Sequence, residues 1–205
     1  MKDSRVTDRS APTAHPIHDL LRARWSPRSF TDAPVTAAQE ASLLEAARWA
    51  ASCFNEQPWV FITARRADAP EDFAKLASLL SANNQAWAPK AGLLMIGFAR
   101  STFAANGNPN AVAAYDVGQA VAQMALQAVA LGLGSHQMRG FDLARAKTEL
   151  GVPEGHEPVV AIAFGVTGAP ELLPEKIAER EVAPRVRKPI TDFAHLGQHG
   201  TPLKL

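Results

Sequence analysis

Two arginines and a serine flank a proline near the start of the chain. The segment Arg24-Trp25-Ser26-Pro27-Arg28 ends a short helix, because a proline pushes the residue before it out of the helical region. Guanidinium groups suit phosphate, since their planar fork donates two parallel hydrogen bonds. The alternative is a solvated helix end at which arginine offsets the C-terminal dipole. The segment therefore predicts either an anion site or an ordinary helix end.

A second basic cluster lies near the other end, at Pro184-Arg185-Val186-Arg187-Lys188-Pro189. Alternate side chains of an extended segment point the same way, so Arg185 and Arg187 would converge on one site while Val186 faces away. A phosphate with a charge of about −2 fits two such guanidinium groups. A solvated basic tail is the alternative.

Asn55 and Gln57 stand in the loop Cys53-Phe54-Asn55-Glu56-Gln57-Pro58-Trp59, which joins a helix to a strand. Each amide carries both a donor and an acceptor. The pair could therefore bind a heteroaromatic ring edge on which donors and acceptors alternate, such as the pyrimidine half of a flavin. The alternative is an ordinary loop in which Pro58 forms the turn.

Other reactive residues favour structural roles. Cys53 is the only cysteine, which excludes an internal disulfide and a cysteine-based metal cage, and a lone cysteine is usually a small buried hydrophobe. The histidines lack the spacing of metal ligands, so no metal site is expected. His136 is expected to be structural, and Asp116 to cap or pack a long helix.

Hydrophobic periodicity and capping residues predict the helices that would position these clusters. They are expected at Ile17–Ala23, from Thr36 to about Ala51, from Asp68 to Leu80, at about Ala111–Leu131, from Asp142 to Leu150 and at Leu173–Glu181, with a helical piece or lid at Asn83–Lys90. Short apolar runs predict strands at Val60–Ala64, Gly92–Ala99 and Pro158–Val166. This alternation indicates an α/β or α+β fold with one sheet, and the crossover connections suggest mixed strand directions.

One domain is expected over residues 16–205, preceded by a flexible tail of residues 1–15 and ending in an extended arm of residues 182–205. Lys and Arg number 21 and Asp and Glu 20, so no bulk field attracts nucleic acid or an anionic membrane. The longest apolar stretch, Ala120–Leu133, is too short and too polar to span a bilayer. The N-terminus lacks signal-peptide features, which makes the cytoplasm the expected location.

Four motifs in this order resemble the nitroreductase-like family of flavoproteins. They are the Arg-x-Ser-x-Arg start, the Cys-Phe-Asn-x-Gln-Pro-Trp loop, the segment Gly132–Asp142 and the Arg-x-Arg-Lys-Pro tail, which together cover roughly residues 15 to 195. A single short motif is a weak signal, whereas four in one order indicate the family. The resemblance implies a nitroreductase-like α+β fold, with a mixed central sheet flanked by helices and an extended C-terminal arm.

The resemblance also implies a bound FMN and roles for particular residues. The phosphate and ribityl chain would be held by Arg24, Ser26, Arg28, Arg185 and Arg187. The flavin ring would be contacted at its edge by Asn55 and Gln57, and by backbone N–H groups along Gln137, Met138, Arg139 and Gly140.

Two residues depart from the family pattern. Trp25 stands where a small or basic residue is usual, and Arg139 where Gly or an acidic residue is common. A cation near the flavin would favour the anionic reduced form and raise the reduction potential. The midpoint potential of an Arg139→Gly variant tests that hypothesis.

The implied reaction is a ping-pong hydride transfer in which NADH or NADPH is a transient reductant. The flavin N5 carries the chemistry, so no catalytic side chain is expected, and the protein supplies orientation and electrostatics. The acceptor would be a nitroaromatic, a quinone or a similar small molecule. The alternatives are an FMN protein with a specialised reaction, such as dehalogenation, azoline oxidation or flavin destruction, and a non-enzymatic FMN-binding regulatory or storage protein. The sequence fixes neither the acceptor nor the choice between NADH and NADPH.

The family resemblance implies a homodimer with FMN at the interface. A long helix with little polar surface and an extended tail independently favour a partner, because both need a surface to bury against. A nucleic-acid-binding module is disfavoured by the near-neutral charge and by the lack of interleaved aromatic and basic residues.

Overall fold

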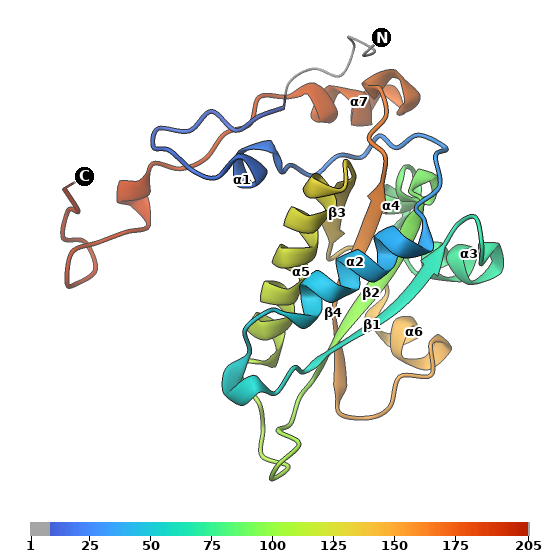
Figure 1. Ribbon diagram of the computed structural model, residues 1–205, viewed down its shortest axis with the longest axis horizontal. Coiled ribbons are helices and arrows are strands. Elements are labelled where there is room, and N and C mark those ends of the chain that lie inside the picture. Colours follow the sequence, from blue (N-terminus) through green and yellow to red (C-terminus); the bar gives the residue numbers. More distant parts are fainter. Residues whose placement is uncertain (1–8, 205) are drawn as a thin grey trace.

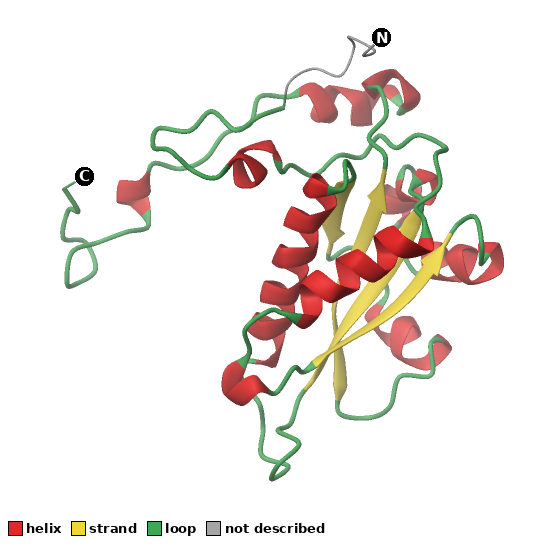
Figure 2. Ribbon diagram, in the orientation of Figure 1, coloured by secondary structure: helices red, strands yellow, loops and turns green. Residues whose placement is uncertain are grey.

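A central sheet with helices on both faces organises the molecule (Figures 1 and 2). The computed structural model describes residues 9–204. Its strands are β1 (Trp59–Arg65), β2 (Leu93–Arg100), β3 (Gly134–Met138) and β4 (His156–Gly165). Its α-helices are α1 (Asp19–Ala23), α2 (Ala37–Arg48), α3 (Pro70–Ser78), α4 (Ala82–Gln85), α5 (Ala113–Ala130), α6 (Leu143–Glu149) and α7 (Glu175–Val182). Short 3-10 helices lie at η1 (Cys53–Asn55), η2 (Ala88–Lys90), η3 (Pro170–Leu172) and η4 (Ile190–Asp192). The α+β class is thereby confirmed.

The sheet has the order β1-β2-β4-β3, and each neighbouring pair in this described sheet is antiparallel. The expectation of mixed strand directions is therefore wrong. Its basis was the helical crossover α5, which does join two strands that run in the same direction, β2 and β3. However, β4 inserts between these two strands, so neither of them has a parallel neighbour.

Side chains alternate across β2 and supply two cores. Leu93 and Met95 belong to a core with α2 and α5, in which Met124 is fully buried. Leu94 and Ile96 belong to a second core, formed with α3 and α6 on the other face. Burial on both faces explains why this strand is a continuous apolar run in the sequence.

Two helix N-termini can be compared with the starts expected from the sequence. The helix expected from Thr36 does begin there, and Thr36 and Gln39 form a capping box in which the Gln39 N–H donates to Thr36 Oγ1 at 3.2 Å and the Thr36 N–H to Gln39 Oε1 at 2.9 Å. The predicted cap at Asp68 is wrong, because Pro70 takes the first helical position and Ala69 precedes it. The Asp68 carboxylate instead accepts a hydrogen bond from Arg65 Nε at 2.6 Å.

β3 is a strand that the sequence pattern did not predict. Its residues are mostly polar and lack β-branched side chains, so they give no strand signal of their own. They are extended because they pair with β4, with Ser135 opposite Phe164. β3 lies at an edge of the described sheet, so alternate backbone N–H groups are directed away from β4.

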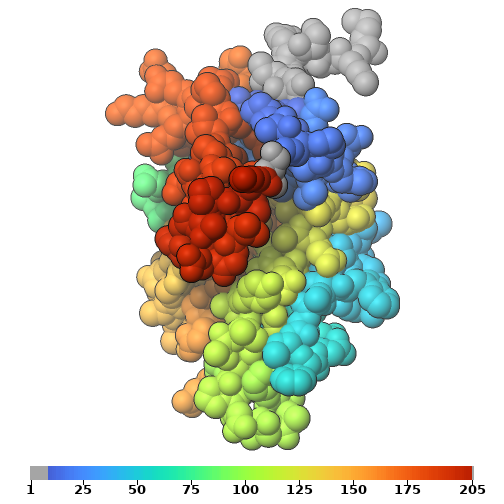
Figure 3. All heavy atoms as spheres, turned by 90° about the vertical axis from the view of Figure 1, so that its left-hand side faces the viewer, coloured from blue at the N-terminus to red at the C-terminus, as the bar shows by residue number. Residues whose placement is uncertain are grey.

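The N-terminal segment that begins at Arg9 lies beside the end of α7 and the segment that follows it (Figure 1). Seen from the direction of Figure 3, the C-terminal arm stands out over this side of the molecule and the N-terminal segment lies beside it. Residues 1–8 of the predicted tail lie outside the described residues. Residues 9–15 belong to the same predicted tail, and Arg9 contacts the segment that follows α7.

Candidate functional site

Six arginines converge on one cavity between the N-terminal segment and the segment that follows α7. The cavity has a volume of about 330 Å³ and is walled by the N-terminal segment, β3 and the segment after α7. The arginines are Arg9, Arg24, Arg28, Arg180, Arg185 and Arg187. Ser26, His136 and Glu181 also line the cavity, and Glu181 is the one carboxylate among the lining residues of the described range 9–204. We call this cavity the arginine pocket.

Close packing brings the Pro27 segment onto the start of β3. A Cβ at Gly134 would lie 2.4 Å from Pro27 Cγ, so only glycine permits this approach. Glu181 then anchors the segment, because its Oε1 accepts the N–H of Arg28 at 2.8 Å and the N–H of Ser29 at 3.0 Å. The Glu181 side chain is only 2% exposed, and its Oε2 lies 3.7 Å from the Arg28 guanidinium. The carboxylate therefore fixes the backbone that carries Arg28.

Like charges crowd the arginine pocket. Burial and the neighbouring Arg187 lower the pKa of Arg24 below its usual value. Burial also lowers the pKa of Arg185, as do Arg24, Arg187 and Arg9. The Nε of Arg9 is buried without a hydrogen-bond partner among residues 9–204. One carboxylate does not balance six guanidinium groups, so the pocket suits an anion.

His136 forms part of the pocket wall as a neutral imidazole. Its Nδ1 lies 2.9 Å from the carbonyl oxygen of Pro27, and its ring centroid lies 4.5 Å from that of buried Trp87. Burial, with a smaller contribution from the nearby Arg28, lowers the pKa of His136 to about 4, against the raising effect of the Pro27 and Ser26 backbone. The carbonyl partner assigns the proton to Nδ1, which leaves Nε2 as an acceptor.

The second predicted cluster forms a loop of unusual backbone geometry. Phe54, Asn55 and Gln57 have φ values of 53°, 56° and 48°, in the left-handed region that costs non-glycine residues energy. Buried Asp116 holds the loop start, because its Oδ2 accepts the Cys53 N–H at 3.1 Å. The Gln57 N–H donates to Ser52 Oγ at 3.0 Å. Residues 52–57 are thus held in a fixed conformation.

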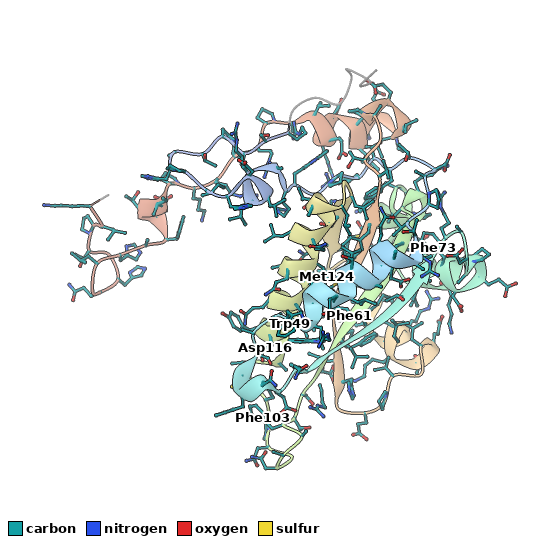
Figure 4. The ribbon with its side chains drawn as sticks, in the orientation of Figure 1. Trp49, Phe61, Phe73, Phe103, Asp116 and Met124 are labelled. Carbon is teal, nitrogen blue, oxygen red and sulfur yellow. The ribbon has the colours of Figure 1, made fainter. Side chains whose placement is uncertain are left out.

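Loop 52–57 and the arginine pocket lie at opposite ends of α5 (Figure 1). Asp116, in the first turn of α5, contacts the loop, whereas Gly134, just beyond the other end of the helix, contacts Pro27. Figure 4 places Asp116 and Phe103 at the loop end of the molecule. An 18-residue helix is about 27 Å long, so one chain does not bring Asn55 and Gln57 to the arginines.

The third predicted group lies along β3 and the turn after it. Gln137 and Arg139 are exposed, and Arg139 lies 5.7 Å over the ring of Phe141. Met138 is buried in the sheet core. The carbonyl of Gly140 accepts the Ser81 N–H at 2.9 Å, which ties this turn to the start of α4.

A larger cavity lies elsewhere and holds none of the predicted site residues. It has a volume of about 390 Å³ and lies between β1, α3 and the end of α6, where Asp72, Lys75 and Glu149 give it mixed charge. Within residues 9–204, no helix is long and apolar enough to cross a bilayer. The same range contains no group of three or more His, Cys, Asp or Glu side chains that could hold a metal ion.

Comparison with known proteins places these features in a family. A model of the nitroreductase family matches residues 21–166. This chain belongs to the nitroreductase family. An uncharacterized 15.4 kDa protein from the ask 5′ region of Mycolicibacterium smegmatis is 36% identical over 152 residues, which are 70% of this chain and 99% of that protein.

Solved structures agree with this membership of the nitroreductase family. An FMN-containing oxidoreductase superposes with a TM-score of 0.87 at 34% identity, covering 92% of this chain and 96% of the other. A structure from Desulfovibrio desulfuricans, solved in complex with FMN, gives a TM-score of 0.67 at 26% identity and covers 93% of this chain and 100% of the other. The expected resemblance and the nitroreductase fold are therefore confirmed.

Several residues at the two sites were not predicted from the sequence. Arg9 lies in a segment taken for a loose tail, and Glu181 was read only as a helix end. Asp116 did give a signal, since an acidic residue inside an apolar helix needs a buried partner. His136 was expected to be structural, and its contacts with Pro27 and Trp87 are structural, yet it also lines the pocket.

Proposed function

We propose that this nitroreductase-family protein is an FMN-dependent NAD(P)H oxidoreductase and that the arginine pocket binds the FMN phosphate. The observation that carries the proposal is the set of six arginines facing a single buried carboxylate. A phosphate with a charge of about −2 complements this excess. The FMN-containing oxidoreductase that shares 34% of its sequence supports the choice of flavin.

The residues of the pocket fit a phosphorylated flavin. Arg24, Ser26, Arg28 and Arg187 would bind the phosphate, and Arg185 lines the same cavity. The Nε2 acceptor of neutral His136 would suit a ribityl hydroxyl. Gln137, Met138, Arg139 and Gly140 would run beside the ring, since β3 has a free edge.

When bound, FMN supplies hydride transfer at its N5, first from NADH or NADPH and then to a nitroaromatic, quinone or similar acceptor in ping-pong order. The side chains position the reactants, and none is assigned a proton-transfer role. The arginines would hold the charged end of FMN, and loop 52–57, with its left-handed backbone, would offer the exposed amides of Asn55 and Gln57 to the ring edge.

The proposed assembly is a homodimer in which loop 52–57 of a second copy reaches the flavin. The support is geometric, because Asn55 lies at the far end of α5 from the arginine pocket within one chain. Phe54 is 90% exposed and Tyr115 is 68% exposed at that end, which is a large apolar surface to leave in water. The projecting C-terminal arm carries Phe193, 67% exposed, and suits contact with a partner. A cytoplasmic location stays a prediction.

A direct test uses the purified protein. We expect a yellow sample with FMN at about one per chain, in which anaerobic NADH or NADPH bleaches the flavin absorbance and an added quinone or nitroaromatic restores it. A yellow protein that neither nucleotide bleaches would contradict the reductase proposal and favour FMN storage or a specialised reductant. A protein that binds no flavin would contradict the proposal altogether.

A further inference from the structure

Two arginines join the N-terminal segment, residues 9–24, to residues 182–185 by donating hydrogen bonds to backbone carbonyls. Arg9 Nη1 donates to the carbonyl of Val182 at 3.0 Å, and its Nη2 to that of Ala183 at 2.7 Å. In the reverse direction, Arg185 Nη2 donates to the carbonyl of Arg24 at 2.8 Å, and its Nη1 to the carbonyl of Arg9. We call this reciprocal arrangement of Arg9 and Arg185 the arginine clasp.

Each arginine of the clasp donates hydrogen bonds to carbonyl groups at the C-terminus of a helix. Val182 is the last residue of α7 and Ala183 is its C-cap, so Arg9 takes two carbonyls that the helix leaves without partners. Arg24 is the C-cap of α1, and Arg185 takes its carbonyl and approaches that of Arg22 at 3.4 Å. Cations at helix C-termini also complement the helix dipole. The clasp therefore joins α1 and α7 beside the arginine pocket, which both arginines line.

Trp25 supplies a platform for the clasp. The Arg9 guanidinium carbon lies 5.3 Å from the centroid of the Trp25 ring, a cation–π arrangement that favours guanidinium over ammonium. Trp25 is one of the two departures from the family pattern in the sequence. Its contact with Arg9 gives that departure a role in this chain.

We propose that Arg9 and Arg185 are positioning residues. They would hold the N-terminal segment against residues 182–187, so that the other arginines of the pocket are in place for a phosphate, and binding the phosphate would not be their main role. Arg9 and Arg185 each direct both Nη groups at backbone carbonyls of a distant segment. Arg187 gives only its Nη1 to a carbonyl, that of the adjacent Val186. Within residues 9–204, the side chains of Arg24 and Arg28 make no hydrogen bond to a backbone carbonyl, so these three arginines keep donors for an anion. This inference rests on the proposed FMN site. It changes the role expected for Arg185 from a phosphate ligand, as predicted together with Arg187 from the sequence, to a positioning residue.

Arg185→Lys tests the inference, because lysine keeps the positive charge and loses the planar fork. A clasp residue should lose FMN affinity by about 10- to 100-fold in this variant, which corresponds to losing the hydrogen bonds of a charged group. Amide hydrogen exchange of the apoprotein should also rise in residues 22–25 and 182–187. Arg9→Lys should change both measurements in the same direction.

Arg22→Lys is the matched control. It lies in the same N-terminal segment with its side chain exposed and outside the pocket, and the substitution leaves its backbone carbonyl in place. FMN affinity and amide exchange should both match the parent protein. Thermal unfolding of each apoprotein checks that the variants are folded.

The outcomes separate the clasp from the proposed function. If the parent protein binds no FMN while Arg185→Lys still raises amide exchange in residues 22–25 and 182–187, the proposed function fails and the clasp stands. If Arg185→Lys weakens FMN binding without changing exchange, Arg185 is a direct phosphate ligand and the clasp is overturned. If neither quantity changes, the clasp is overturned as well.

Discussion

The arginine pocket and loop 52–57 are built in opposite ways. The pocket is assembled from segments more than 150 residues apart, as when Glu181 accepts the N–H of Arg28 across a sequence separation of 153. The loop is local, has three left-handed residues and leaves Phe54 90% exposed. The pocket thus completes its contacts within one chain, whereas the loop presents its strained, apolar surface outward. This difference is the basis of the proposed site that two copies share, in which one copy would supply the anion end and the other the ring contacts.

The largest expected effect comes from the buried carboxylate of the pocket. Glu181→Ala leaves the N–H groups of Arg28 and Ser29 without their acceptor and removes the one carboxylate that lines the pocket within residues 9–204. Breaking such a buried charged contact should cost about 3–5 kcal/mol of unfolding free energy. Urea unfolding measures the change.

Glu179→Ala is the control, because Glu179 lies exposed on the same helix. This variant should unfold within about 0.5 kcal/mol of the parent protein. Equal unfolding free energies for the two variants would show that the pocket does not depend on Glu181.

The pocket should also respond to acid through His136. Its folded pKa of about 4 lies below the usual 6.5, so the unfolded chain binds the proton more readily. Stability should therefore fall as the pH drops from about 6.5 towards 4, by a total on the order of 3 kcal/mol from this residue. Chemical unfolding of the parent protein and of His136→Gln at several pH values measures the difference.

That acid-dependent loss should be absent from His136→Gln and present in a His15→Gln control, since His15 is exposed. A parent protein and a His136→Gln variant with the same pH dependence would contradict the burial of His136.

A smaller effect is expected at the loop. Asp116→Ala removes the acceptor of the Cys53 N–H, and an unsatisfied buried donor costs about 1–3 kcal/mol. Amide exchange should rise in residues 52–57 and stay unchanged in residues 180–187, because α5 separates the two regions.

Asp116→Asn retains a side-chain oxygen acceptor and should keep most of the protection in the loop. Identical exchange in the two Asp116 variants, or a change that extends to the arginine pocket, would contradict independent behaviour of the two regions.

Much of the fold was readable from local patterns. The apolar run predicted at Gly92–Ala99 is β2 at Leu93–Arg100, and the long helix predicted at about Ala111–Leu131 is α5 at Ala113–Ala130. Such elements follow from periodicity within one segment. By contrast, β3 depends on pairing with β4, and the antiparallel sheet depends on the insertion of β4 between β2 and β3. Neither dependence is visible within a single segment.

Some residues of the candidate site were likewise predicted from the local sequence, whereas others depend on contacts between distant segments. Arg24, Arg28 and Arg187 were predicted from residue type and spacing, and the structure brings them to one pocket. Arg9 and Glu181 act through contacts with backbone groups more than 150 residues away, for which the sequence carries no spacing rule. Asn55 and Gln57 were predicted together with the arginines but do not reach them in one chain, because the length of α5 separates loop 52–57 from the pocket.

Mixing two variants tests the shared site most directly. Arg24→Gln damages the pocket and Asn55→Ala damages the loop, so each homodimer should reduce its acceptor poorly. If loop and pocket come from different copies, random reassembly should restore about a quarter of the sites, since half of the dimers are mixed and each mixed dimer has one intact site. NAD(P)H oxidation by the mixture should then rise well above that of either variant, with FMN bound at the restored sites. A mixture that shows only the average activity of the two variants, with mixed dimers present by mass, would contradict the shared site.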